Sequence, residues 1–206
     1  MPPLTLLVKP VSGLCNLACG YCFGRDLFSR RGTAQAGVMD ASLVDALLSR
    51  AFAYAEGACT FVFQGGEPCL AGLGFYQDFV ALARSRRPPG LELGFMLQTN
   101  GVLIDDAWAR FLAQEGFLTG LSIDGPRILH DKNRQFPDGS GSHGLVMDSA
   151  RRLKEAKADF NVLCVVDSGI ADNPLLVWDF FRRKGLDWIQ YIPCLEPFGA
   201  GRPGSA

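Results

Sequence analysis

The sequence lacks the long hydrophobic runs, the charge excess and the leader segment that mark several classes of protein. Its apolar runs are broken well short of the roughly 18 residues that a membrane span requires. Residues 1–9 lack the basic start and the cleavage site of a signal peptide. A net charge of −1 removes the electrostatic case for nucleic-acid binding. We therefore expect a cytoplasmic protein with neither nucleic acid nor a membrane among its partners.

The seven cysteines lack both a complete pairing and a second C-x2-C knuckle. An odd number cannot all form disulfides, and in a reducing compartment cysteines more often serve metal binding or catalysis. Three of them, Cys15, Cys19 and Cys22, form a C-x3-C-x2-C loop. Three thiolates are one fewer than a closed metal site needs, which favours an iron–sulfur cluster with one iron left open. The alternative is a structural zinc site whose fourth ligand comes from Cys59, Cys69, Cys194, His130 or His143.

Apolar strand patterns alternate with helical patterns along the 206 residues, a length that suits one domain with its own core. We expect strands near residues 4–9, 59–64, 91–98, 117–123, 160–166 and 188–192. We expect helices near residues 41–55, 75–85, 106–114, 145–156 and 175–184. Asp40 is the expected N-cap of the first helix, and Leu43 belongs to the face that this helix is expected to bury. The alternation predicts an α/β fold with a parallel sheet, either open and doubly wound or part of a barrel.

Each distinctive polar motif directly follows one of these predicted strands. Ligands bind beyond the carboxyl ends of parallel strands, so the motifs are expected to converge on one face. The sixth strand is followed by a Gly- and Pro-rich tail at residues 197–206 rather than by a sixth helix. We therefore expect one domain over residues 1–196 whose sixth strand lacks a covering helix, in a chain truncated after that strand.

The cysteine loop with its Tyr21 and the turn Gly65-Gly66-Glu67-Pro68 together resemble the radical S-adenosylmethionine (SAM) superfamily. Motifs at residues 98–101, 121–126 and 130–134 resemble the anaerobic sulfatase-maturating branch, whose members carry a C-terminal SPASM domain. The resemblance implies a partial (β/α)6, TIM-like barrel. It also implies that the three cysteines hold a [4Fe-4S] cluster and that SAM chelates the fourth iron.

The same resemblance implies a radical SAM oxidoreductase that reductively cleaves SAM to a 5′-deoxyadenosyl radical. The radical would oxidise a serine or cysteine of a sulfatase polypeptide to Cα-formylglycine, with electrons from a flavodoxin- or ferredoxin-type donor. We expect the SPASM domain, with its auxiliary clusters and the proposed catalytic base, to be absent from this chain, so no catalytic residue is assigned. The alternatives are another SPASM-type peptide modifier, forming thioethers or crosslinks, and a non-catalytic zinc- or partner-binding module.

The resemblance also implies a set of SAM-binding residues: Tyr21, Gly65, Gly66, Glu67, Ser122, Arg134 and Leu195. Arg134 is predicted in a long polar loop, where its planar guanidinium group suits the SAM carboxylate. Leu195 has an alternative interpretation as a core leucine. Gln64, which precedes the two glycines, is the candidate substrate contact.

The remaining histidines and two of the remaining cysteines are given structural or solvent roles. His130 and His143 are predicted in the long polar loop, with solvent as their partner. Cys59 and Cys164 lie in strand patterns and are predicted to be small core residues.

Overall fold

The computed structural model of the protein describes residues 2–22, 24 and 37–195, and six parallel strands form the centre of this part. The strands are β1 (Leu4–Val8), β2 (Ala58–Phe63), β3 (Glu92–Thr99), β4 (Leu118–Ser122), β5 (Phe160–Val166) and β6 (Ile189–Pro193). All six predicted strands are confirmed. Residue 196, the last residue of the expected domain, and the tail at 197–206 lie outside the described residues.

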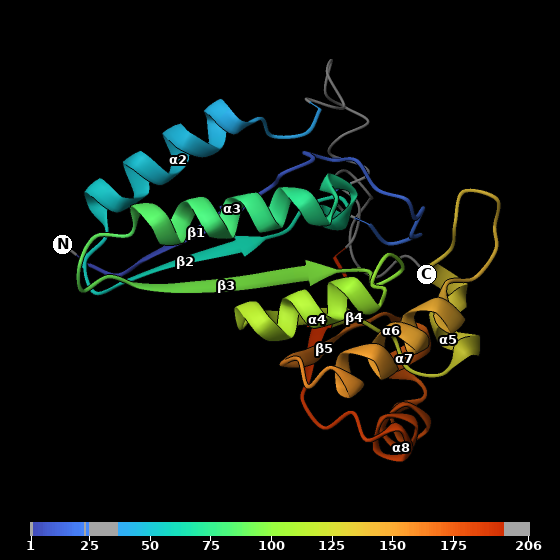
Figure 1. Cartoon of the computed structure of the whole chain (residues 1–206). Coiled ribbons are helices and arrows are strands. Elements are labelled where there is room, and N and C mark those ends of the chain that lie inside the picture. Colours follow the sequence, from blue (N-terminus) through green and yellow to red (C-terminus); the bar gives the residue numbers. More distant parts are fainter. Residues whose placement is uncertain (1, 23, 25–36, 196–206) are drawn as a thin grey trace.

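Helices connect successive strands and follow the curve of the sheet (Figure 1). They are α2 (Ala41–Tyr54), the short 3-10 helix η1 (Pro68–Ala71), α3 (Leu73–Arg86), α4 (Asp106–Glu115), α5 (Arg127–Asn133), α6 (His143–Glu155), α7 (Ser168–Ala171) and α8 (Pro174–Lys184). Local signals set their ends: the Asp40 carboxylate accepts from the Leu43 N–H at 2.8 Å at the start of α2. Helix α8 begins at Pro174 and ends before Gly185, whose φ of 59° is left-handed.

The strand order distinguishes the two architectures that the sequence leaves open. Each strand pairs in parallel with the next one along the chain, in the order β1-β2-β3-β4-β5-β6. A doubly wound sheet reverses its strand order at a switch point, whereas a barrel adds strands in sequence. The described residues therefore form an α/β half-barrel, as the resemblance implied.

The core between the sheet and helix α3 is built from aromatic side chains. Phe63 of β2 is fully buried, and its ring centroid lies 4.9 Å from both Tyr76 and Phe79 of α3, in edge-to-face geometry. The Tyr76 hydroxyl donates to the Pro68 carbonyl at 2.9 Å. This hydrogen bond attaches η1 to the core, and η1 begins shortly after the turn at Gly65–Gly66, the diglycine turn.

Some local predictions are wrong. Helices α5 and α7 were not predicted, because α5 carries a polar run (residues 130–133) and α7 is only four residues long. Leu43 is 52% exposed rather than buried, since α2 presents Val44, Leu48 and Ala51 to the sheet.

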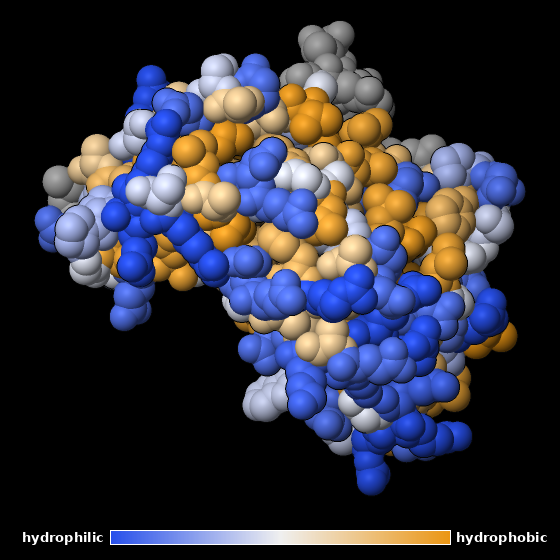
Figure 2. All heavy atoms as spheres, viewed as in Figure 1, coloured by the Kyte–Doolittle hydropathy of each residue, from blue (hydrophilic) through white to orange (hydrophobic). Residues whose placement is uncertain are grey.

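Figure 2 shows mostly hydrophilic side chains over the α6–α8 end of this face. Over α2 and α3, apolar side chains also lie at the surface, between hydrophilic ones. No helix among the described residues is long and apolar enough to cross a membrane.

Candidate active site

The motifs identified in the sequence lie where strands end, at one edge of the sheet. The cysteine loop (residues 15–22) follows β1, the Gly65–Gly66 turn follows β2, and Asn100 follows β3. Ser122 ends β4, and Leu195 lies just beyond β6. Because the strands are all parallel, their carboxyl ends meet at the same edge of the half-barrel.

The diglycine turn packs against the chain that enters the cysteine loop. Gly66 has a φ of 50°, and a Cβ there would overlap the carbonyl oxygen of Leu14. The N–H of the next residue, Glu67, donates to that same carbonyl at 2.7 Å. Only glycine permits this approach with this backbone conformation. The turn therefore fixes where the cysteine loop begins.

The Glu67 side chain is 1% exposed and points into the protein. Its Oε1 accepts from the Thr99 hydroxyl at 2.7 Å and from the Cys69 N–H at 3.0 Å, and its Oε2 accepts from the Asn100 N–H at 2.8 Å. Burial raises the pKa of this carboxyl group, and the hydrogen bonds from Asn100, Thr99 and Cys69 oppose that rise. Glu67 thus joins the turn to the end of β3. A contact between Glu67 and SAM stays a prediction.

Asn100 carries this connection on to the cysteine loop. Its Nδ2 donates to Asn16 Oδ1 at 2.8 Å and to Cys15 Sγ at 3.9 Å, and its Oδ1 accepts from the Val102 N–H at 3.0 Å. The Leu17 N–H also donates to Cys15 Sγ, at 3.4 Å. The sequence places Asn100 inside a motif, but no role for it could be predicted because its partners lie 84 and 85 residues away.

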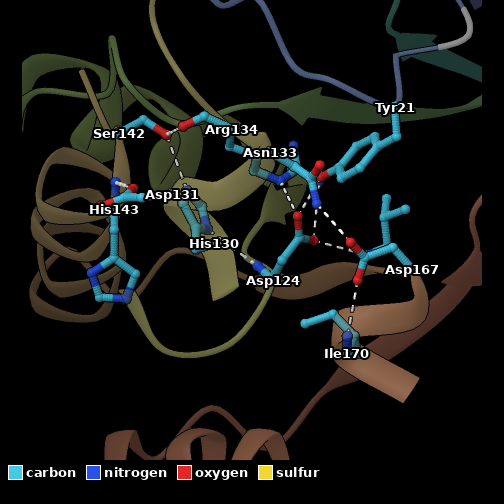
Figure 3. A network of polar contacts seen from close by, with 11 residues as sticks. Tyr21, Asp124, His130, Asp131, Asn133, Arg134, Ser142, His143, Asp167 and Ile170 are labelled. Carbon is cyan, nitrogen blue, oxygen red and sulfur yellow. Dashed lines mark hydrogen bonds and ion pairs between the residues drawn. The ribbon is translucent and has the colours of Figure 1, made fainter. Parts of the chain in front are cut away.

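A second network holds the cysteine loop from the other side, centred on Asp124 (Figure 3). Asp124 is 1% exposed, and its Oδ2 accepts from the Tyr21 hydroxyl and from Arg134 Nε, the latter at 2.8 Å. Its Oδ1 accepts from Arg134 Nη2 at 3.3 Å and from the Val165 N–H at 2.8 Å. One carboxylate therefore joins the cysteine loop, the end of β4, the end of α5 and strand β5.

The Arg134 guanidinium group is part of this network. Its Cζ lies 5.5 Å from the centroid of the Tyr21 ring. Burial lowers the pKa of Arg134, but the Asp124 carboxylate and the other groups around the guanidinium together raise it above its usual value, so the side chain stays a cation within the ion pair. Its proposed contact with the SAM carboxylate stays a prediction.

Backbone hydrogen bonds complete the attachment of the cysteine loop. The Ala18 N–H donates to the Gln135 carbonyl at 2.7 Å, and the Gly20 N–H donates to the Asn133 carbonyl at 3.0 Å. The segment that follows α5 therefore pairs with the middle of the loop. This segment was predicted as a long polar loop; instead, Arg134 is the C-cap of helix α5.

The prediction that the two histidines face solvent is wrong. His130 is fully buried in α5, and its Nδ1 accepts from the Asp124 N–H at 3.2 Å. Its Nε2 lies 3.0 Å from Ser142 Oγ, whose hydroxyl donates to the Arg134 carbonyl at 2.8 Å. These partners require the neutral ring with its hydrogen on Nε2. Burial lowers the pKa of His130 to about 3. His143 is 8% exposed, with its ring 5.4 Å from that of His130.

The three thiols of the cysteine loop differ in how far they are exposed. Cys15 and Cys22 are exposed, and Cys19 is partly buried. Burial raises the pKa of Cys19 to about 11, and nearby Arg134 opposes that rise. In a [4Fe-4S] cluster the cysteine thiolates bind different irons, and the three cysteines of this loop can supply three such ligands.

The remaining predicted residues occupy varied positions. Gln64 is half-buried, and its Nε2 donates to Gln98 Oε1 at 2.7 Å. Two amide side chains therefore lie together at the mouth of the half-barrel, the edge where the strands end. Leu195 is 63% exposed, so the alternative of a core leucine is wrong. Cys59 and Cys164 are fully buried, as predicted for core residues. Sequence reasoning missed Asp124, although an acid directly after a buried strand is a usable signal.

Residues 10–176 match the Radical SAM superfamily, and because the match covers most of the chain, the protein belongs to that superfamily. Its cofactors are accordingly a [4Fe-4S] cluster and SAM, and the exposed thiols and the glycine-lined approach described above fit them.

Sequence relatives narrow the likeness within the superfamily. The cysteine-type anaerobic sulfatase-maturating enzyme of Clostridium perfringens is 42% identical over 96% of this chain and 53% of its own length. The serine-type enzyme of Klebsiella aerogenes is 35% identical over 98% of this chain and 49% of its own length. The chain thus spans about half the length of these curated relatives.

A solved structure agrees with both the fold and the cofactor. The structure of native anSMEcpe with bound AdoMet and Kp18Cys peptide superimposes with a TM-score of 0.91 and 40% sequence identity. The superposition covers all of this chain and 55% of that protein. The half-barrel described here is therefore a radical SAM barrel fold.

Proposed function

We propose that this chain is the SAM-cleaving part of an anaerobic sulfatase-maturating enzyme, which oxidises a peptidyl cysteine or serine to Cα-formylglycine. The observation that supports this best is the attachment of the cysteine loop. Gly66, Asn100 and Asp124 hold it at the mouth of the half-barrel with its thiols partly open. Relatives of both the cysteine and the serine type support this choice among radical SAM activities.

The residues at the mouth have distinct tasks in this proposal. Cys15, Cys19 and Cys22 hold the cluster, which with SAM supplies a one-electron reduction and a radical able to abstract hydrogen. Tyr21, Gly65, Gly66, Glu67, Ser122, Arg134 and Leu195 form the SAM-binding set. The buried Asp124 carboxylate lies behind that set and holds Tyr21 and Arg134 in place. Gln64, paired with Gln98, lies where a peptide substrate would enter.

The partners follow from the same proposal. The substrate is a sulfatase polypeptide, and the reductant is a flavodoxin- or ferredoxin-type donor. A peptide bound to a relative supports this class of substrate. The proposed location is the cytoplasm, a reducing compartment in which cysteines serve as metal ligands more often than as disulfide partners.

The cofactor part is tested by anaerobic reconstitution followed by addition of SAM and dithionite, with 5′-deoxyadenosine measured by chromatography. We expect 5′-deoxyadenosine from the wild type and none from Cys19→Ala. The matched control is Cys59→Ala, which removes a fully buried thiol near the start of β2, at the other end of that strand from the Gly65–Gly66 turn, and should keep the product. Equal yields from wild type and Cys19→Ala would refute the proposal.

The substrate part needs a separate assay on the wild-type protein. Peptides of a sulfatase active-site segment, with cysteine or serine at the modified position, are incubated with the reconstituted protein, and a hydrazide probe captures any aldehyde. Aldehyde on either peptide supports the proposal. Production of 5′-deoxyadenosine with a thioether or crosslink in place of aldehyde would assign the chain to another kind of peptide modifier.

A further inference from the structure

The sulfur of Cys15 receives two N–H donors, one from its own loop and one from the side chain of Asn100, the residue after strand β3. The Leu17 N–H lies 3.4 Å from Sγ, and Asn100 Nδ2 lies 3.9 Å from it. The first donor comes with the local turn. The second comes from a residue that was not among the predicted site residues and to which the superfamily match assigns no role.

The orientation of the Asn100 amide is fixed by its other contacts. Its Oδ1 accepts from the Val102 N–H at 3.0 Å, so the oxygen must face Val102 and the nitrogen must face the cysteine loop. One Nδ2 hydrogen goes to Asn16 Oδ1 at 2.8 Å, which leaves the other for Cys15. A flipped amide would place its oxygen against Asn16 Oδ1 and its nitrogen against the Val102 donor.

The backbone of Asn100 is also held in place, by a buried carboxylate. It is 8% exposed, and its own N–H donates to the buried Glu67 carboxylate at 2.8 Å. A hydrogen bond in such a poorly hydrated place is weakly screened by solvent. The donor therefore points at Cys15 before any cofactor binds.

We propose that Asn100 tunes the cluster by donating a hydrogen bond to the Cys15 thiolate, which raises the reduction potential of the cluster. Reduction adds one electron from the external reductant and moves no proton, so negative charge on the thiolate sulfurs increases. A donor to sulfur stabilises the reduced form more than the oxidised form, and such bonds are a known determinant of cluster potentials. Asn100 thus eases the electron transfer that starts the proposed reaction.

The test is an EPR-monitored redox titration of the anaerobically reconstituted protein without SAM. In Asn100→Leu, which keeps the shape but lacks the donor, we expect reduction to be about tenfold less favourable, equal to ~59 mV for one electron. Asn100→Asp should lower the potential further, because a negative charge replaces the donor. The control Thr99→Val breaks a bond to Glu67 but leaves Nδ2 in place, and its potential should match the wild type.

An unchanged potential in Asn100→Leu, or an equal shift in Thr99→Val, would overturn the inference. A second measurement on the unaltered protein avoids the risk that a variant fails to assemble a cluster. Protein labelled with 15N only at asparagine side-chain amides should show a 15N coupling to the reduced cluster in pulsed EPR. That coupling should persist in labelled Asn16→Asp, which lacks the neighbouring amide, and its absence would refute the inference.

The inference rests on the cysteine loop holding the cluster. If no cluster assembles on the wild-type loop, the proposed function and this inference fail together. If the cluster assembles and cleaves SAM but its potential does not respond to Asn100, only this inference fails.

Discussion

Two buried carboxylates support the cysteine loop, and they do so by different chemistry. Glu67, after β2, accepts from a hydroxyl and two backbone N–H groups, all of them neutral donors. Asp124, after β4, faces the buried Arg134 cation as well as the Tyr21 hydroxyl and a backbone N–H. Both side chains are 1% exposed. The same architectural task is thus performed once by neutral hydrogen bonds and once by an ion pair.

The difference predicts which support is harder to alter. A carboxylate surrounded by neutral donors can lose one bond and leave no charge without a counterion. An ion pair that loses its anion leaves a buried cation, which is far more costly. Replacing Asp124 should therefore lower the free energy of unfolding more than replacing Glu67. Four measurements test the two networks.

The largest effect is expected for Asp124→Asn. Arg134, 7% exposed, would lose its counter-charge, and the free energy of unfolding should fall by about 3–5 kcal/mol in chemical denaturation. The control Asp179→Asn removes a carboxylate whose cation, Arg183, is 76% exposed and 3.6 Å away, so its loss should be below about 1 kcal/mol. Equal losses in the two variants would contradict the comparison.

Glu67→Gln should have a smaller effect. One of its two oxygens becomes an NH2 group that faces a donor, so the expected loss is about 1–3 kcal/mol. Glu155→Gln, on the exposed side of α6, changes the same chemical group outside the core and should leave the unfolding curve unmoved. A loss for Glu67→Gln as large as that for Asp124→Asn would remove the distinction between the two supports.

Acid should weaken the Asp124 network through His130. The pKa of His130 is lowered to about 3 in the folded protein, against about 6.5 in the unfolded chain, so the unfolded state binds more protons between those values. The free energy of unfolding should therefore fall as pH decreases below about 6.5, approaching about 1.4 kcal/mol per pH unit from this group. Chemical unfolding curves of wild type and His130→Gln, recorded from about pH 7 to about pH 4, measure this dependence of the free energy of unfolding on pH. Identical pH slopes would rule the mechanism out.

The smallest effect is expected for Tyr21→Phe. The variant removes one of several donors to Asp124 while keeping the ring beside Arg134, so stability should fall by only about 1 kcal/mol. Tyr54→Phe, at a half-exposed position on α2, is the matched control and should show no change. A loss above that of Glu67→Gln would mean that Tyr21 carries more of the network than its single bond indicates.

The sequence was sufficient for the sheet, because strand and helix periodicity together with caps such as Asp40 and Gly185 are local signals. It was also sufficient for the three cysteines, whose spacing is local. It was insufficient for α5, where His130 looks like a surface residue until its Asp124 and Ser142 partners are in place. The roles of Asn100 and Asp124 depend on contacts between segments distant along the chain, which no single-sequence pattern encodes.

The span of those contacts has a consequence for the order of folding. Tyr21 meets Asp124 across 103 residues, and Cys15 meets Asn100 across 85. During synthesis the thiols therefore emerge long before the side chains that shape their loop, and such distant contacts form slowly because a long loop must close first. Cluster insertion is accordingly expected to follow the assembly of β3 and β4. Until then, the three thiols lie in a loop that lacks the contacts that give it its final shape.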